Sequence, residues 1–206
     1  NTDNTMNSRT ALITFFSVFS LFCLSACSGS GNTEPEVIVI AASGEPAAGL
    51  DEGYVYERFD GAHTIGASGE VAFTATANNQ NGGPRDRKTV LWFGKPDDLQ
   101  PAVQVGQPVP DLGDNVIING FQPTPQVITE SGRLGFIADT SALMTNVSPH
   151  ALLVYDDGNL EKAIAAGDSV PMQTEQKLLL SISAFAMSDA GILFMGKVAR
   201  NQSGLW

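Results

Sequence analysis

The chain has few cysteines, few charged side chains and no basic run. Two cysteines, Cys23 and Cys27, occur in 206 residues, so a packed apolar core must stabilise the fold in place of disulfides. Charged residues make up 16 % of the sequence, while 21 glycines and 11 prolines favour strands and turns over long surface helices. The net charge of −11 excludes nucleic acid as an expected partner, because phosphate binding requires clustered lysines and arginines.

Patterns for catalysis and metal binding are equally sparse. His63 and His150 are the only histidines, and no His, Cys or Asp spacing around them suggests a metal site. The sequence lacks a Gly-x-Ser-x-Gly nucleophile elbow, so we assign no catalytic residue. Four acidic turn residues could bind Ca²⁺ weakly, but they do not match the spaced calcium loop and are better interpreted as solvated turns. These residues are Asp111, Asp114, Asp156 and Asp157.

The N-terminal residues have the layout of an export signal. Met6 is the expected start, which makes residues 1–5 an upstream artefact. The apolar run over 11–24 is shorter than the ~20 residues of a membrane-spanning helix. A polar stretch with Arg9, an apolar core and small residues after it are typical of a secretory signal, here expected over 6–26.

The small residues Leu24-Ser25-Ala26-Cys27 resemble the lipobox of bacterial lipoproteins. The resemblance implies cleavage between Ala26 and Cys27, a diacylglycerol on the Cys27 sulfur and an acyl chain on its new amino group. Several acyl chains together give a stable membrane anchor. Residues 27–35 would be a flexible tether, and Ser28 rather than Asp after the cysteine resembles the pattern sent to the outer membrane. The alternative is an ordinary signal peptide with an incidental cysteine.

Two short signatures each occur three times, about sixty residues apart, which indicates a tandem structural repeat. One signature begins at Gly44, Gly106 and Gly167. The other runs over 69–73, 132–136 and 191–195.

Each repeat is predicted to form a four-stranded antiparallel meander. In the second repeat, strands are expected at 125–129, 134–139, 151–155 and 160–165, with a tight hairpin at 156–159. Strands of the first repeat are expected at 63–65, 71–76, 89–93 and 102–105, and those of the third at 184–187 and 193–198.

The predicted fold is therefore all-β, a partial β-propeller truncated from a longer ring of six or seven blades. Residues 37–41 would be an outermost strand that completes the last blade. The expected units are 36–60, 61–123, 124–183 and a partial blade at 184–206. A β-sandwich or a β-solenoid is the alternative.

The repeats resemble those of bacterial surface proteins with varied anchors, named for the pattern Asn-x-x-Gly-x-x-Ala-Phe. The pattern's Gly is Gly69, Gly132 and Gly191; its Ala position holds Ala72, Gly135 and Phe194; its Phe position holds Phe73, Phe136 and Met195. The Asn position departs from the pattern, with Gly66, Thr129 and Ser188. The family has no assigned enzymatic activity, so the resemblance implies surface anchoring only.

Two functions remain open from the sequence. The first is a non-catalytic cell-envelope lipoprotein that binds a protein or glycan, with the polar loop at 78–88 as the expected contact surface. The second is a hydrolase or lyase with its site in a propeller channel completed by further blades. Trp92, Phe93 and Tyr155, taken as equivalent positions, are expected in the core rather than on a sugar-stacking surface.

Overall fold

The computed structural model describes residues 37–83, 86–113, 115–141, 149–172, 175–199 and, for the backbone only, 202–205. Every regular element in these residues is a strand, and thirteen strands form three antiparallel sheets. The all-β prediction is therefore confirmed. All three sheets lie in the unit formed by residues 40–206.

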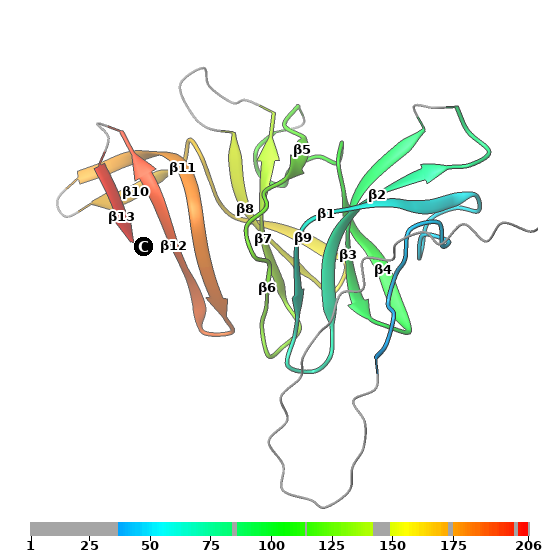
Figure 1. The fold of residues 1–206 in the computed structure, drawn as a ribbon. Helices are drawn as coiled ribbons and strands as arrows, with labels where there is room; N and C mark the ends of the chain where they lie inside the picture. Colours follow the sequence, from blue (N-terminus) through cyan, green and yellow to red (C-terminus); the bar gives the residue numbers. More distant parts are fainter. Residues whose placement is uncertain are drawn as a thin grey trace, which may run out of the picture. The chain divides into compact units, whose positions relative to one another are not determined.

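Each sheet is built from consecutive strands (Figure 1). The first sheet contains β1 (Tyr54–Ile65), β2 (Val71–Asn79), β3 (Arg87–Lys95) and β4 (Asp98–Gln104). The middle sheet contains β5 (Ile118–Phe121), β6 (Val127–Ile128), β7 (Leu134–Thr140), β8 (His150–Asp156) and β9 (Asn159–Ala165). The third sheet contains β10 (Ser169–Met172), β11 (Glu175–Ser188), β12 (Gly191–Val198) and β13 (Gln202–Leu205).

The meander is regular in the first sheet and modified in the other two. In the middle sheet the first strand is broken into β5 and β6, and both pair with β7. In the third sheet the short strand β10 pairs with β11 ahead of the meander. The first meander strands of the first and third sheets, β1 and β11, also begin earlier than expected. They therefore cross the unit boundaries predicted at residues 61 and 184.

The same turn precedes each of the three sheets and explains the first sequence signature. The N–H groups of Gly44, Gly106 and Gly167 donate to the carbonyls of Tyr56, Ile118 and Leu179, each at 2.8 Å. The same three acceptor residues donate their own N–H groups to Glu45, Gln107 and Asp168 at 3.0, 2.9 and 2.9 Å. The glycines have φ of +88°, +96° and +101°, a conformation that side chains other than glycine rarely adopt. The sequence repeat is thus a repeat of hydrogen-bonded structure.

The second signature marks the turn after the first strand, and its third copy is one residue shorter. The pairs Ile65–Val71 and Ile128–Leu134 close the first two turns, whereas Met187 pairs with Ile192. Leu193 and Phe194 therefore stand where Ala72 and Phe73 stand in the first sheet. The assignment of Phe194 and Met195 to the Ala and Phe positions was wrong, because it aligned the copies on their glycines across turns of unequal length.

The strand register corrects a second equivalence. Trp92 pairs with Phe73 as Leu153 pairs with Phe136, whereas Tyr155 pairs with Leu134. Tyr155 is thus the counterpart of Gly94, which pairs with Val71. The rings of Phe93 and Tyr155 nevertheless meet edge to face between two sheets, with centroids 6.1 Å apart.

The sheets pack on one another through two apolar cores. The first core joins residues of the first sheet, such as Ala72 and Leu91, to residues of the middle sheet, such as Leu134 and Phe136. The second core joins the opposite face of the middle sheet to the third sheet. Its buried members are Ile137, Leu152, Val170, Leu179, Ile182, Phe194 and Val198. The middle sheet is therefore covered on both faces, which explains the nearly continuous apolar sequence of β8.

A third cluster lies on the other face of the first sheet. Tyr56, Val90 and Trp92 are buried there, and residues 40–50 pack over part of this face. Residues 37–41 form no strand, contrary to the prediction. A strand requires hydrogen-bonding to a neighbouring strand, and none of the three described sheets includes this segment.

Candidate functional site

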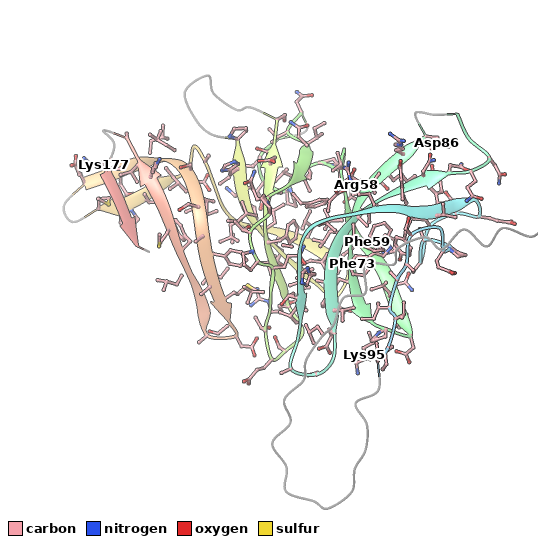
Figure 2. All side chains as sticks on the ribbon, viewed as in Figure 1. Arg58, Phe59, Phe73, Asp86, Lys95 and Lys177 are labelled. Carbon is pink, nitrogen blue, oxygen red and sulfur yellow. The ribbon has the colours of Figure 1, made fainter. Side chains whose placement is uncertain are left out.

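The loop between β2 and β3, predicted as the contact surface, is anchored by a polar cluster that we call the loop cluster: Asp51, Tyr54, Asn79, Asp86 and Lys88. The Tyr54 hydroxyl donates to Asp86 Oδ1 at 2.5 Å, and Asn79 Nδ2 donates to Asp86 Oδ2 at 2.8 Å. Figure 2 labels Asp86 at this end of the first sheet. Both carboxylate oxygens of Asp86 therefore have a protein donor.

Backbone contacts complete this anchor. The Asn79 side-chain oxygen accepts from the N–H of Asn81 at 2.9 Å, and Gln80 N–H donates to Gly53 O at 2.9 Å. A Cβ at Gly53 would lie 2.8 Å from Asn81 Nδ2 and 2.9 Å from Asn79 Oδ1. The β1 entry and the β2–β3 loop are thus in direct contact, and glycine leaves room for that contact.

Charge is distributed around Tyr54. The ammonium of Lys88 lies 4.3 Å from the centre of the Tyr54 ring and 3.7 Å from Asp51 Oδ2. The hydrogen bond to Asp86 raises the pKa of Tyr54, because the carboxylate favours the protonated phenol. The hydrogen bonds of Tyr54 and Asn79 to Asp86 act as a latch that fixes the base of the loop.

An aromatic cluster lies on the open part of the first sheet. The Phe73 and Trp92 rings stack with their centroids 5.8 Å apart. The centroid of the Phe59 ring lies 5.5 Å from that of Tyr56 and 5.7 Å from that of Phe73. Trp92 is fully buried and its indole N–H donates to Ala48 O at 2.9 Å, which confirms its predicted core role. Phe59 is exposed, and Figure 2 shows it beside Phe73.

Sequence reasoning missed a polar group in the middle sheet. His150 Nε2 lies 3.2 Å from Asp139 Oδ1, and the Gln122 amide donates to the same oxygen at 2.5 Å. His150 and Asp139 are directly opposite in the β7–β8 ladder, a pairing visible only once the register is known. His150 Nδ1 is shielded from solvent and has no hydrogen-bond partner among the described residues. His63 lies on β1.

The described acidic residues considered for Ca²⁺ lie at two separate turns. Asp156 lies 3.4 Å from Arg133 Nε, and Asp157 adopts φ of +45° in the β8–β9 hairpin. Asp111 has φ of +59° in a different loop, and Asp114 lies outside the described residues. In the ranges that the structure describes, no three His, Cys, Asp or Glu side chains gather in a group able to hold a metal ion.

The lipobox residues 24–27 and the tether also lie outside the described residues. Within the described part, no helix has the length and apolar character to cross a membrane.

The geometry defines an all-β protein made of repeated antiparallel sheets with a latched polar loop. A family model described as a family of unknown function, DUF7453, matches residues 25–206, so the chain belongs to the DUF7453 family. No curated protein and no solved structure gave a significant match.

Proposed function

We propose that this protein is a lipid-anchored lipoprotein of the bacterial cell envelope whose β-repeat domain is a non-catalytic binding scaffold. The three sheets would be consecutive blades of a β-propeller. The same hydrogen-bonded turn leads into every sheet, and each pair of consecutive sheets shares a core. These features support a propeller, because its blades are four-stranded meanders packed side by side.

The observation that carries the binding role is the latch of Tyr54 and Asn79 on Asp86. A loop whose base is fixed before binding loses less conformational entropy when a partner binds. Both Asp86 oxygens are already engaged, which favours a role in holding the loop over proton transfer or cation binding. We propose that the surface of this loop contacts a protein or a glycan of the envelope.

A pull-down from envelope extract tests the binding role, using the intact chain with and without Ca²⁺. Asp86→Ala releases the latch and should reduce the recovery of the partner, whereas Asp157→Ala in the distant β8–β9 hairpin should not. Equal recovery by both variants would show that the loop is not the contact surface. Turnover of a glycan panel by a chain that retains no partner would support an enzyme instead.

The anchor has an independent test in membrane fractionation. Cys27→Ser removes the sulfur that the lipobox resemblance assigns to acylation, so the protein should leave the membrane fraction. Cys23→Ser, within the apolar run, is the matched control and should remain membrane-bound. Membrane association of the Cys27→Ser chain equal to that of the control would contradict the anchor.

A further inference from the structure

Asn-Gly, the dipeptide most prone to spontaneous loss of its side-chain amide, occurs twice in the chain, at 81–82 and at 119–120. The reaction begins when the amide nitrogen of the glycine attacks the asparagine side-chain carbon, and glycine favours this attack because it has no Cβ and a freely rotating backbone. Asn81 and Asn119 are both exposed among the described residues. The backbone around each pair, and not its accessibility, therefore decides which asparagine reacts.

The backbone at Asn119 opposes the reaction. Asn119 lies within β5, and Gly120 pairs with Asp139 of β7. An extended strand holds the side-chain carbon away from the next amide nitrogen, so the two atoms meet only after the ladder has opened. The pairing of Gly120 therefore protects Asn119, although Asn119 itself lies at a shift of register.

Asn81 lies instead in the turn that follows β2. Its N–H donates to the Asn79 side-chain oxygen at 2.9 Å, and the N–H of Gly82 donates to the Asn79 carbonyl at 3.2 Å. The bond from Gly82, which holds the attacking nitrogen, is at the long end of the usual range. A turn also opens at a lower free-energy cost than a sheet ladder does, so Asn81 is the less protected of the two asparagines.

The latch explains why a glycine stands at position 82. A Cβ there would collide with Asp86 Oδ2 and lie 2.8 Å from Asp86 Cβ. A larger residue would therefore displace Asp86 from Tyr54 and Asn79, the two donors that hold it. The close contact that fixes the loop thus requires the same residue that makes Asn81 reactive.

We propose that Asn81 is a site of spontaneous deamidation. The Gly82 nitrogen bonds to the Asn81 side-chain carbon and loses its proton, the side-chain nitrogen leaves as ammonia, and a cyclic imide remains. One water molecule then adds to the imide and breaks either of its two ring carbon–nitrogen bonds, which gives aspartate or isoaspartate at position 81. Water is the only other reactant, and nothing is oxidised or reduced. The reaction does not depend on a partner at the loop.

Both products alter the latch. Each places a carboxylate where a neutral amide stood, in a loop that already holds the Asp86 carboxylate, and like charges repel. Isoaspartate also lengthens the main chain between positions 81 and 82 by one atom, which shifts Gly82 from its contact with Asp86. The modified chain therefore holds the base of the loop less firmly than the fresh chain.

Peptide mass spectrometry of the full chain, incubated at neutral pH and physiological temperature, tests the site. The peptide that contains Asn81 should gain the mass of a deamidation, and chromatography should separate its aspartate and isoaspartate forms. Asn119 is the internal control. Asn81 should convert at least about tenfold faster, because opening of the β5 ladder adds to the barrier at Asn119. Equal rates at the two positions, faster conversion at Asn119, or an Asn81 that stays intact would overturn the proposal.

Limited digestion with trypsin tests the effect on the latch. Cleavage after Arg87, whose guanidinium lies 2.7 Å from Glu57 Oε1 in the latched loop, should be at least about threefold faster in the incubated chain than in the fresh chain, since cleavage follows the population of the opened loop. Asn81→Gln is the matched control, because the longer side chain forms the imide far more slowly. After the same incubation this variant should be cleaved no faster than when fresh. An incubated parent that carries isoaspartate yet is cleaved at the rate of Asn81→Gln would show that the latch is unaffected.

Discussion

Gly135→Ala places a methyl group in the contact between the middle and third sheets. The new Cβ would lie 2.8 Å from Phe185 Cε2 and 3.1 Å from both Met187 Cε and Sδ. Overpacking costs about 1–3 kcal/mol, and replacing a strand glycine returns about 0.5–1 kcal/mol. We therefore expect the free energy of unfolding to fall by about 1 kcal/mol, which corresponds to a decrease of about 3 °C in Tm for a domain of this size.

The assay is urea unfolding followed by circular dichroism on the purified chain carrying Cys27→Ser. Phe185→Leu removes the ring atom nearest the new methyl group, so the double variant should lose less stability than the sum of the two single variants. The coupling should be at least about 0.5 kcal/mol, as is usual for residues in contact.

Gly132→Ala is the matched control. Gly132 has φ of +85° and no atom within 4 Å of an added Cβ, so its substitution acts through backbone strain alone. Its effect should therefore add to that of Phe185→Leu without coupling. If Gly135→Ala were as stable as the parent and did not couple to Phe185→Leu, the close approach of the two sheets at this glycine would be refuted.

Two further predictions concern the repeated turn and the loop cluster. Gly106→Ala should cost about 1–2 kcal/mol of unfolding free energy through its positive φ, and Gly106→Asn should cost less, because asparagine tolerates this region; urea unfolding of both variants checks the order. Because its folded-state pKa is raised, Tyr54 stabilises the fold fully below pH ~10, and this contribution is lost as pH rises through the folded-state pKa. Alkaline unfolding of Tyr54→Phe should accordingly show a shallower loss of stability than the parent, while Tyr56, whose pKa burial also raises, keeps part of the slope.

The features predicted correctly are those set by local chemistry. The Asp-Gly pair at 157–158 forms the expected β8–β9 hairpin, with φ of +45° and +83°, because both central positions of a type I′ turn require positive φ. The alternation of apolar residues correctly predicted β7, and the long apolar run correctly predicted β8. These signals depend on a few adjacent residues, so a single sequence is sufficient to find them.

Features that depend on partners far along the chain were not predictable. The register of β1 shifts between Tyr56 and Arg58 and between Phe59 and His63, and such bulges disrupt the alternation that marks a strand. The broken strand, by contrast, has a local cause, because Pro123 and Pro125 lie between β5 and β6 and cannot donate to the ladder. The contact of Tyr54 with Asp86 spans 32 positions, and nothing local to either residue indicates the other.

The third repeat shows that a recurring glycine predicts the face on which a strand residue lies less well than the alternation of apolar residues does. Successive strand residues point to opposite faces, so a shift of one residue exchanges the buried and exposed sets. Aligned on Gly191, Met195 would face the middle sheet and Phe194 would face away from it. The structure has the reverse, with Phe194 9 % exposed in the second core and Met195 half exposed. The turn is shorter by one residue, and this keeps the Phe194 side chain in the core. The sheet-to-sheet contact is therefore preserved by the alternation of buried and exposed side chains and not by the position of the glycine.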